Sequence, residues 1–262
     1  MDLLATVNMH GIQTSGNCIR NITTDELAGI APDEIADPRP FAEIIRQWST
    51  LHPEFAFLPR KFKIAITGAS NDRAAVRWHD VGLHLIKNDA GELGFRVFVG
   101  GGMGRTPVIS TEIRAFLPWN QIMNYLEAVV RVYNRWGRRD NAYKARIKIL
   151  VKAEGQRYID EVEAEYQQIL TRDGAPHTIS QAELDRVSAC FVPPALAERA
   201  QAAIKTVANN TTVPAERQKD YDRWLQQNVA SHKNPALRAV TLSYKRLGQA
   251  PGDADADQLD TA

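Results

Sequence analysis

Apolar residues follow helical spacing in several segments of the chain. The first such segment predicts a helix over residues 41–50, with apolar positions three and four residues apart at Phe41, Ile44, Ile45 and Trp48. A longer helical face follows Pro118 and comprises Ile122, Leu126, Val129, Val130 and Tyr133. Another continues after a basic loop with Ile147, Leu150 and Val151. A capping residue at Thr24 or Asp25 predicts one further helix start.

Three short runs between the first two helical segments have strand character. Residues 63–67, 81–86 and 95–99 are rich in β-branched or aromatic side chains. Turn-forming residues separate them, as in Asn88-Asp89-Ala90-Gly91. The runs predict a small antiparallel meander, and with the helices they predict an α+β fold in which a small mixed or antiparallel sheet is backed by helices.

The last third of the chain is polar and mostly helical. Helix-like runs cover residues 181–189, 195–208 and 215–229, with a turn or linker at residues 209–214. Residues 238–245 alternate as a half-buried strand does. An acidic tail follows Pro251-Gly252-Asp253.

Composition excludes several classes of protein. The 262 residues are 44% hydrophobic, enough for one large or two small domains, and 32 basic residues face 31 acidic ones. This balance gives no indication of a nucleic-acid partner. No apolar run approaches the roughly 20 residues that span a bilayer, and no leader pattern opens the chain, so a cytoplasmic protein without a membrane partner is expected.

The two cysteines, Cys18 and Cys190, are far apart and predict neither a disulfide framework nor a metal site. Cys18 is expected to be a small buried thiol. His10, His79 and His84 have no carboxylate or cysteine at ligand spacing and are expected to be structural or surface residues.

A basic pair carries the strongest indication of chemistry. Pro59 stiffens a turn that leads through Lys61 and Lys63 into an apolar strand. Because side chains alternate along an extended segment, both ammonium groups project from one face. Two like charges so placed favour an anion as ligand, and the alternative is a pair of solvated strand-flanking lysines.

Residues 14–23, 58–63, 94–105 and 136–148, in this order and spacing, closely resemble the sirohaem-dependent nitrite and sulfite reductases, the family of the sulfite reductase haemoprotein beta-component. The resemblance implies an assimilatory enzyme that reduces nitrite or sulfite by six electrons at sirohaem coupled to a 4Fe-4S cluster. It also implies an electron donor such as ferredoxin or a flavoprotein. Nitrite and sulfite cannot be told apart, because the same cationic pocket serves both.

The resemblance assigns Arg20, Lys61 and Lys63 to the catalytic residues around the bound anion and, with Asn21, to the cofactor contacts. Lysine and arginine suit both roles, because they give charge-assisted hydrogen bonds to sirohaem carboxylates and to substrate oxygens. For Arg20 the alternative is an ion pair with Asp25 or Glu26 near a helix start.

The resemblance also assigns cofactor contacts to Gly100, Gly101, Gly102 and Arg105. Consecutive glycines permit positive φ and close approach of backbone amides to a flat or anionic ligand. The dinucleotide fingerprint is not met, because Arg105 stands where its last glycine belongs. The alternative is a plain flexible turn.

A run of basic residues between the helical faces has two interpretations. The simpler interpretation is that these side chains are solvated residues flanking a helix. The other is that some of them contact sirohaem carboxylates. A nucleic-acid-binding stripe is not indicated, because no aromatic platform accompanies the run. The run comprises Arg135, Arg138, Arg139, Lys144, Arg146 and Lys148.

The resemblance predicts that the chain is the central part of a longer enzyme. A four-iron cluster needs four thiolates, which two cysteines cannot supply. The expected layout is the end of a first ferredoxin-like half-domain at 1–13, the sirohaem-binding domain at 14–170, a helical linker at 171–234 and the start of a second half-domain at 235–262. The alternative is a truncated product that binds sirohaem or an anion without turnover.

Overall fold

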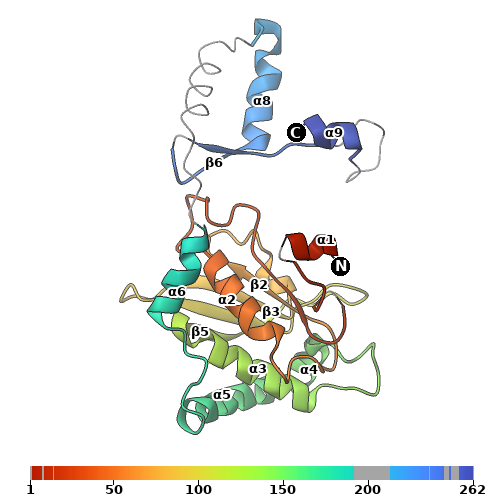
Figure 1. Ribbon diagram of the computed structural model, residues 1–262, viewed down its shortest axis with the longest axis vertical. Helices are drawn as coiled ribbons and strands as arrows, with labels where there is room; N and C mark the ends of the chain where they lie inside the picture. The colour runs from red at the N-terminus through yellow and green to blue at the C-terminus, as the bar shows by residue number, and fades with distance from the viewer. Residues whose placement is uncertain are drawn as a thin grey trace. The chain divides into compact units, whose positions relative to one another are not determined.

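The computed structural model describes residues 2–7, 9–13, 15–191, 213–235, 237–244, 248 and 254–261. The chain forms two compact units, the first made of Met1–Gly29 with Asp33–Pro193 and the second of Ile30–Pro32 with Pro194–Ala262. Figure 1 shows the α+β character of the first unit, in which helices accompany a central sheet.

The sheet of the first unit has five strands in the order β1-β2-β3-β4-β5. Their bounds are β1 Ile19–Thr23, β2 Phe62–Thr67, β3 Val81–Lys87, β4 Leu93–Val99 and β5 Thr111–Pro118. The β1–β2 and β2–β3 pairs are parallel, and the β3–β4 and β4–β5 pairs are antiparallel. The sheet is therefore mixed.

The expected antiparallel meander is correct for β3 and β4 but wrong for β2 and β3. Residues 68–80 carry the chain back along the sheet through the short 3-10 helix η1, Val76–Trp78, and this length suffices for a parallel crossover. Strands β1 and β5 are not predicted. In β5 the buried Ile113 and Leu117 lie four residues apart on one face, a strand signal that the prediction omits.

The described part of the first unit has six helices. They are α1 Asp2–Thr6, α2 Arg39–Thr50, α3 Ile122–Trp136, α4 Ile147–Glu154, α5 Gln156–Thr171 and α6 Gln181–Ser188. Residues of α2 to α6 share a large core with one face of the sheet. Helix α2 lies beside α6, and α3 packs against α4 and α5 (Figure 1). The helices predicted over residues 41–50, from Ile122, from Ile147 and over 181–189 are confirmed.

The two faces of β2 meet different surroundings. Phe62, Ile64 and Ile66 belong to the large core shared with α2, α3 and α5. The intervening Ala65 belongs instead to a small cluster with Val76 and Phe98. Since Lys63 alternates with Phe62 and Ile64, it lies on the face of the small cluster, away from the large core.

The helix start expected at Thr24 or Asp25 is wrong, because residues 24 and 25 are irregular and residues 26–29 form a turn. Oδ1 of Asp25 accepts a hydrogen bond from the Leu27 N–H at 2.9 Å and pairs with Nε of Arg73 at 3.3 Å. An aspartate that bonds the backbone two residues on favours a turn over a helix. Gly29 then adopts a φ of +83°, which directs the chain away from a helical path.

The second unit contains the 3-10 helix η4, Ala215–Arg217, then α8 Gln218–Asn228, β6 Val229–Ser231, β7 Arg238–Val240 and α9 Ala256–Thr261. Strands β6 and β7 form an antiparallel pair. The helix predicted over 215–229 is confirmed, and the strand predicted over 238–245 ends earlier. The helix predicted over 195–208 lies outside the described residues.

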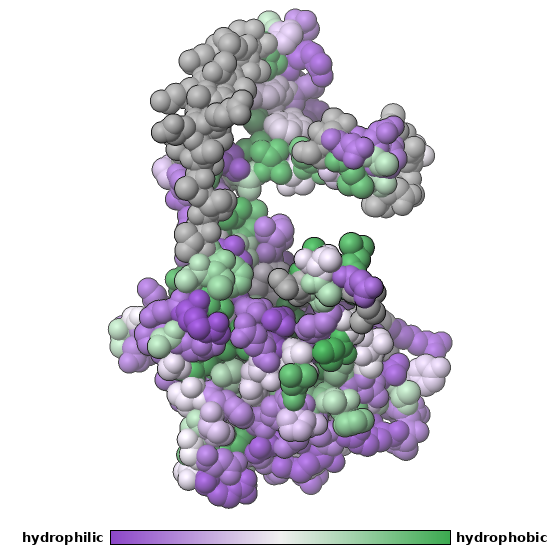
Figure 2. Space-filling view, viewed as in Figure 1, coloured by the Kyte–Doolittle hydropathy of each residue, from purple (hydrophilic) through white to green (hydrophobic). Residues whose placement is uncertain are grey.

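Hydrophilic side chains cover much of the first unit's surface in Figure 2, with hydrophobic residues scattered between them. No helix among the described residues combines the length and apolarity needed to cross a membrane.

Candidate functional site

Strand pairing brings Arg20 into the neighbourhood of the two lysines. In the parallel β1–β2 pair, Ile19 lies opposite Phe62 and Asn21 opposite Lys63, with a register shift between them. Arg20 occupies this irregularity. The structure therefore collects Arg20, Asn21, Lys61 and Lys63 at one end of two adjacent strands.

The charges at this strand end act on one another. Burial lowers the pKa of Lys61, and the positive charges of Arg146, Arg20 and Lys63 lower it further. Among the described residues, no carboxylate forms an ion pair with Arg20, Lys61 or Lys63. A half-buried cation near other cations favours the binding of an anion, because the anion offsets the repulsion between the positive charges.

A hollow opens beside the lysines and continues into an apolar one. The first has a volume of ≈ 220 Å³ and is lined by Lys61, Lys63, Trp78, His79, Asp80, Met103, Gly104 and Arg146. The second has a volume of ≈ 340 Å³ and is lined by Trp78, Gly102, Met103, Gly104, Pro107, Val108 and Ile109. The exposed side chains of Trp78 and Met103 border both.

Asp80 links the elements around the first hollow. Its buried carboxylate accepts a hydrogen bond from the Lys63 N–H at 3.0 Å through Oδ2. Oδ1 accepts from Nε and Nη2 of Arg146 at 3.0 and 2.6 Å. Burial raises the pKa of Asp80, and the Arg146 guanidinium opposes that rise. Asp80 thereby fixes the position of Arg146 relative to the start of β2.

The loop after β4 is shaped by the chain's own packing. Gly100 has a φ of +88°, and a Cβ on Gly101 would lie 2.4 Å from the Arg77 carbonyl oxygen. Gly102 exchanges two backbone hydrogen bonds of 2.9 Å with Val108. The plain flexible turn is therefore wrong for Gly100 and Gly101, because the lack of a side chain lets Val151 of α4 approach Gly100 and lets η1 approach Gly101.

Arg105 is exposed on the loop that this arrangement presents. The buried Nζ of Lys148 donates hydrogen bonds to the carbonyl oxygens of Met103 at 3.0 Å and of Thr106 at 2.5 Å, so α4 anchors the same loop. Burial lowers the pKa of Lys148, and the charge of Arg146 adds to this effect.

Arg20 does not line the hollow beside the lysines but a further one. This further hollow has a volume of ≈ 270 Å³ and is lined by His10, Gln13, Ile19, Arg20, Asn21, Ile22 and Arg46. Nε of Arg20 donates to the Gly16 carbonyl oxygen at 2.9 Å. The alternative that Arg20 pairs with Asp25 or Glu26 is wrong, because Asp25 pairs with Arg73 and neither carboxylate forms an ion pair with Arg20.

Three of the six members of the basic run form ion pairs within the described part of the chain. Arg135 pairs with Glu161 and Glu165, Arg138 with Asp140, and Arg146 with Asp80. The interpretation as solvated helix flank is thus wrong for Arg146 and for the buried Lys148. Asp80 was not identified from the sequence. Its position directly before a buried strand could have indicated it, because a carboxylate there needs a cationic partner.

Comparison with known proteins identifies relatives of this region. The family model described as "Nitrite and sulphite reductase 4Fe-4S domain" matches residues 15–170. "Sulfite reductase [ferredoxin] 1" of Mycolicibacterium paratuberculosis is 32% identical over 190 residues, which are 70% of this chain and 34% of that protein. "Ferredoxin--nitrite reductase, chloroplastic" of Arabidopsis thaliana is 28% identical over 153 residues, 56% of this chain and 26% of that protein.

Among solved structures, that of the Mycobacterium tuberculosis NirA protein aligns with a TM-score of 0.54 and 32% identity. The alignment covers 59% of this chain and 28% of the other. The chain spans about a third of the length of the curated relatives that it matches first.

Proposed function

The chain belongs to the nitrite and sulphite reductase 4Fe-4S domain family, and on this premise we propose that it supplies the cationic part of a site for sirohaem and a small oxyanion. The reaction proposed for the whole enzyme is the six-electron reduction of sulfite or nitrite. Ferredoxin is the proposed electron donor, since relatives of both kinds carry it in their names.

The observation that carries this proposal is the pair of adjoining hollows. Lys61, Lys63 and Arg146 line the cationic hollow, and Trp78 and Ile109 contribute to the apolar one. Sirohaem is a flat, largely apolar ring that bears carboxylates around its edge. The apolar hollow offers a surface for part of the ring, and the cations suit its carboxylates and the substrate oxygens.

Each residue of the candidate site has a proposed role. Lys61 and Lys63 bind the oxyanion, and Arg20 reaches it from β1. Their charges stabilise the negative charge that builds on the anion during reduction. Asn21, Gly102 and Arg105 contact the cofactor, while Gly100 and Gly101 serve it by shaping the loop. When bound, sirohaem supplies the redox-active iron.

The chain's own residues do not fit a 4Fe-4S cluster. Its only two cysteines are Cys18, which is half-buried, and Cys190, which is exposed. Such a cluster requires four thiolate ligands. This shortage of cysteines favours a second candidate function, in which the chain binds sirohaem or the anion without catalytic turnover.

Titration of the purified chain with sirohaem, followed by its visible absorption, tests the proposal. We expect saturable binding that weakens at least about tenfold when Lys61→Met and Lys63→Met are combined, because two charge-assisted contacts are lost. The matched control is Lys87→Met, an exposed lysine at the end of β3. Equal affinity of the double variant and the control would refute the proposed role of the lysines.

A further inference from the structure

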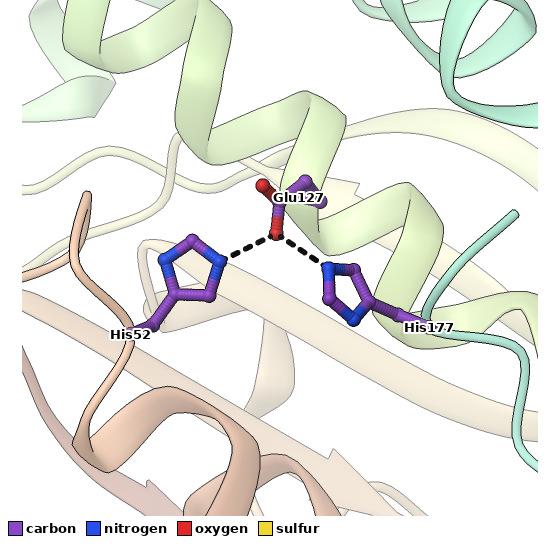
Figure 3. A group of neighbouring side chains, drawn as sticks. All are labelled: His52, Glu127 and His177. Carbon is purple, nitrogen blue, oxygen red and sulfur yellow. Dashed lines mark ion pairs between the residues drawn. The ribbon is translucent and has the colours of Figure 1, made fainter. Parts of the chain in front are cut away.

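Three side chains meet on the helical side of the sheet, apart from the cationic hollow. His52 follows α2, Glu127 lies in α3, and His177 lies in the segment between α5 and α6. Figure 3 shows both imidazoles directed at one carboxylate oxygen of Glu127. Nε2 of His52 lies 3.0 Å from Oε2, and Nε2 of His177 lies 3.6 Å from it.

These separations suit a shared metal ion. Zn²⁺ binds histidine nitrogen and carboxylate oxygen at about 2.0–2.2 Å, and tetrahedral geometry then separates neighbouring ligand atoms by about 3.3–3.6 Å. The two nitrogen–oxygen distances bracket this range, and the three ligand atoms all lie within 4.8 Å of one another. Small side-chain rotations would bring them onto one ion.

The Glu127 carboxylate is buried, and the guanidinium that pairs with it is shared with other carboxylates. The side chain is 1% exposed, and neither oxygen accepts a hydrogen bond of good geometry. Nη2 of Arg131 lies 2.9 Å from Oε1. The same guanidinium also pairs with Glu54, Glu165 and Asp173, so four carboxylates share it. A dication at Oε2 would offset the local excess of negative charge.

We propose that Nε2 of His52, Oε2 of Glu127 and Nε2 of His177 bind one divalent transition-metal ion of the zinc type. Two histidines and one glutamate form a known zinc donor set. Arg131 orients the carboxylate through Oε1 and leaves Oε2 free for the metal. The His52 and His177 side chains are 11% and 27% exposed, which leaves room for entry and for water as fourth ligand.

Metal binding at this site has one identifiable cost. The Glu54 N–H donates to Nδ1 of His52 at 3.3 Å, a long hydrogen bond. With a metal on Nε2, the neutral ring carries its proton on Nδ1, so this contact is lost. Three metal bonds replace it and join three segments that are distant in sequence.

The test is titration of the metal-free full chain with Co²⁺, which absorbs strongly in the visible range when it is tetrahedral. We expect saturation at one ion per chain and displacement by Zn²⁺. Zn²⁺ at about 100 times its Kd should also raise the Tm by about 5–10 °C. The ring centroid of Trp48 lies 5.5 Å from the centroid of each imidazole, so Co²⁺ should quench tryptophan fluorescence as well.

His177→Gln removes one ligand and should weaken Co²⁺ binding at least about tenfold. His84→Gln is the matched control, because His84 hydrogen-bonds to the Ala69 carbonyl oxygen outside the cluster. If the native chain binds no stoichiometric Co²⁺ or Zn²⁺, or if both variants bind as tightly as the native chain, the three residues form only an ion-paired network. Either result overturns the proposal, and the first does so without any variant.

Discussion

At the scale of single residues, buried charged side chains hold in place the side chains that face the candidate ligand site. Asp80 lines the first hollow, and its two carboxylate oxygens accept hydrogen bonds from the Lys63 backbone and from Arg146. Lys61 and Lys63, by contrast, pair with none of the described carboxylates. Sequence reasoning found the lysines from their spacing, but Asp80 and Arg146 are 66 residues apart and share no local motif.

Asp80→Asn should destabilise the first unit by about 2–4 kcal/mol, because the Arg146 charge loses its buried partner. Chemical denaturation measures the free energy of unfolding. Asp89→Asn, in the exposed turn after β3, should change it by less than about 0.5 kcal/mol. Equal stability of the two variants would show that the Asp80–Arg146 pair does not hold these elements together.

The lowered pKa of Lys61 predicts a pH dependence of anion binding. An ordinary lysine loses its proton near pH 10.4, and Lys61 should lose it at lower pH because burial and neighbouring cations disfavour the charged form. A bound anion favours the charged form, so affinity should fall as the pH rises toward the pKa of Lys61.

Sulfate is the suitable probe, since its charge is constant in this range. Calorimetric titration from about pH 7 to 10 should show weakening for the native chain and a flatter, weaker profile for Lys61→Met. A native affinity that is constant up to about pH 10 would contradict the role of Lys61.

At the scale of elements, periodicity predicted the amphipathic helices, because burial selects one face of each. It predicted β2, β3 and β4 but not their directions. Direction depends on the crossover through residues 68–80, and no local pattern reports whether such a connection returns along the sheet. The pairing of β1 with β2, which places Arg20 beside the lysines, is likewise a non-local contact.

The glycine loop yields a prediction at this scale. Gly101→Ala would place a Cβ 2.4 Å and 2.6 Å from the carbonyl oxygens of Arg77 and His79, so the backbone must shift, at a cost of about 2 kcal/mol or more. Gly104→Ala meets open space and pays only for a φ of +95°, about 1 kcal/mol. Thermal unfolding of both variants compares them; a smaller loss for Gly101→Ala would contradict the steric account.

At the scale of the whole molecule, the family is established and the chain spans about a third of its first relatives. Family membership was predictable because four segments carry the resemblance in order, and the α+β class because strand-like runs lie between helical faces. The expected domain boundaries remain a prediction. The number of cysteines limits the iron–sulfur chemistry of this chain, wherever the domain boundaries lie.

The purified chain should contain no 4Fe-4S cluster, because two cysteines cannot provide four thiolates. Iron and acid-labile sulfide analysis after anaerobic purification measures this directly. Four iron atoms per chain would refute the prediction, whereas iron held by sirohaem would appear without acid-labile sulfide.

The central claim is that Lys61 and Lys63 bind a small oxyanion. The most direct measurement is NMR of the lysine side chains, with ¹³C at Cε and assignment by substitution, during titration with sulfite. We expect saturable shifts of the Lys61 and Lys63 signals at one shared affinity, with Lys87 and Lys152 unmoved because both are exposed outside the hollow. Equal, non-saturating shifts of all four lysines would mean that Lys61 and Lys63 are merely solvated and do not bind the anion.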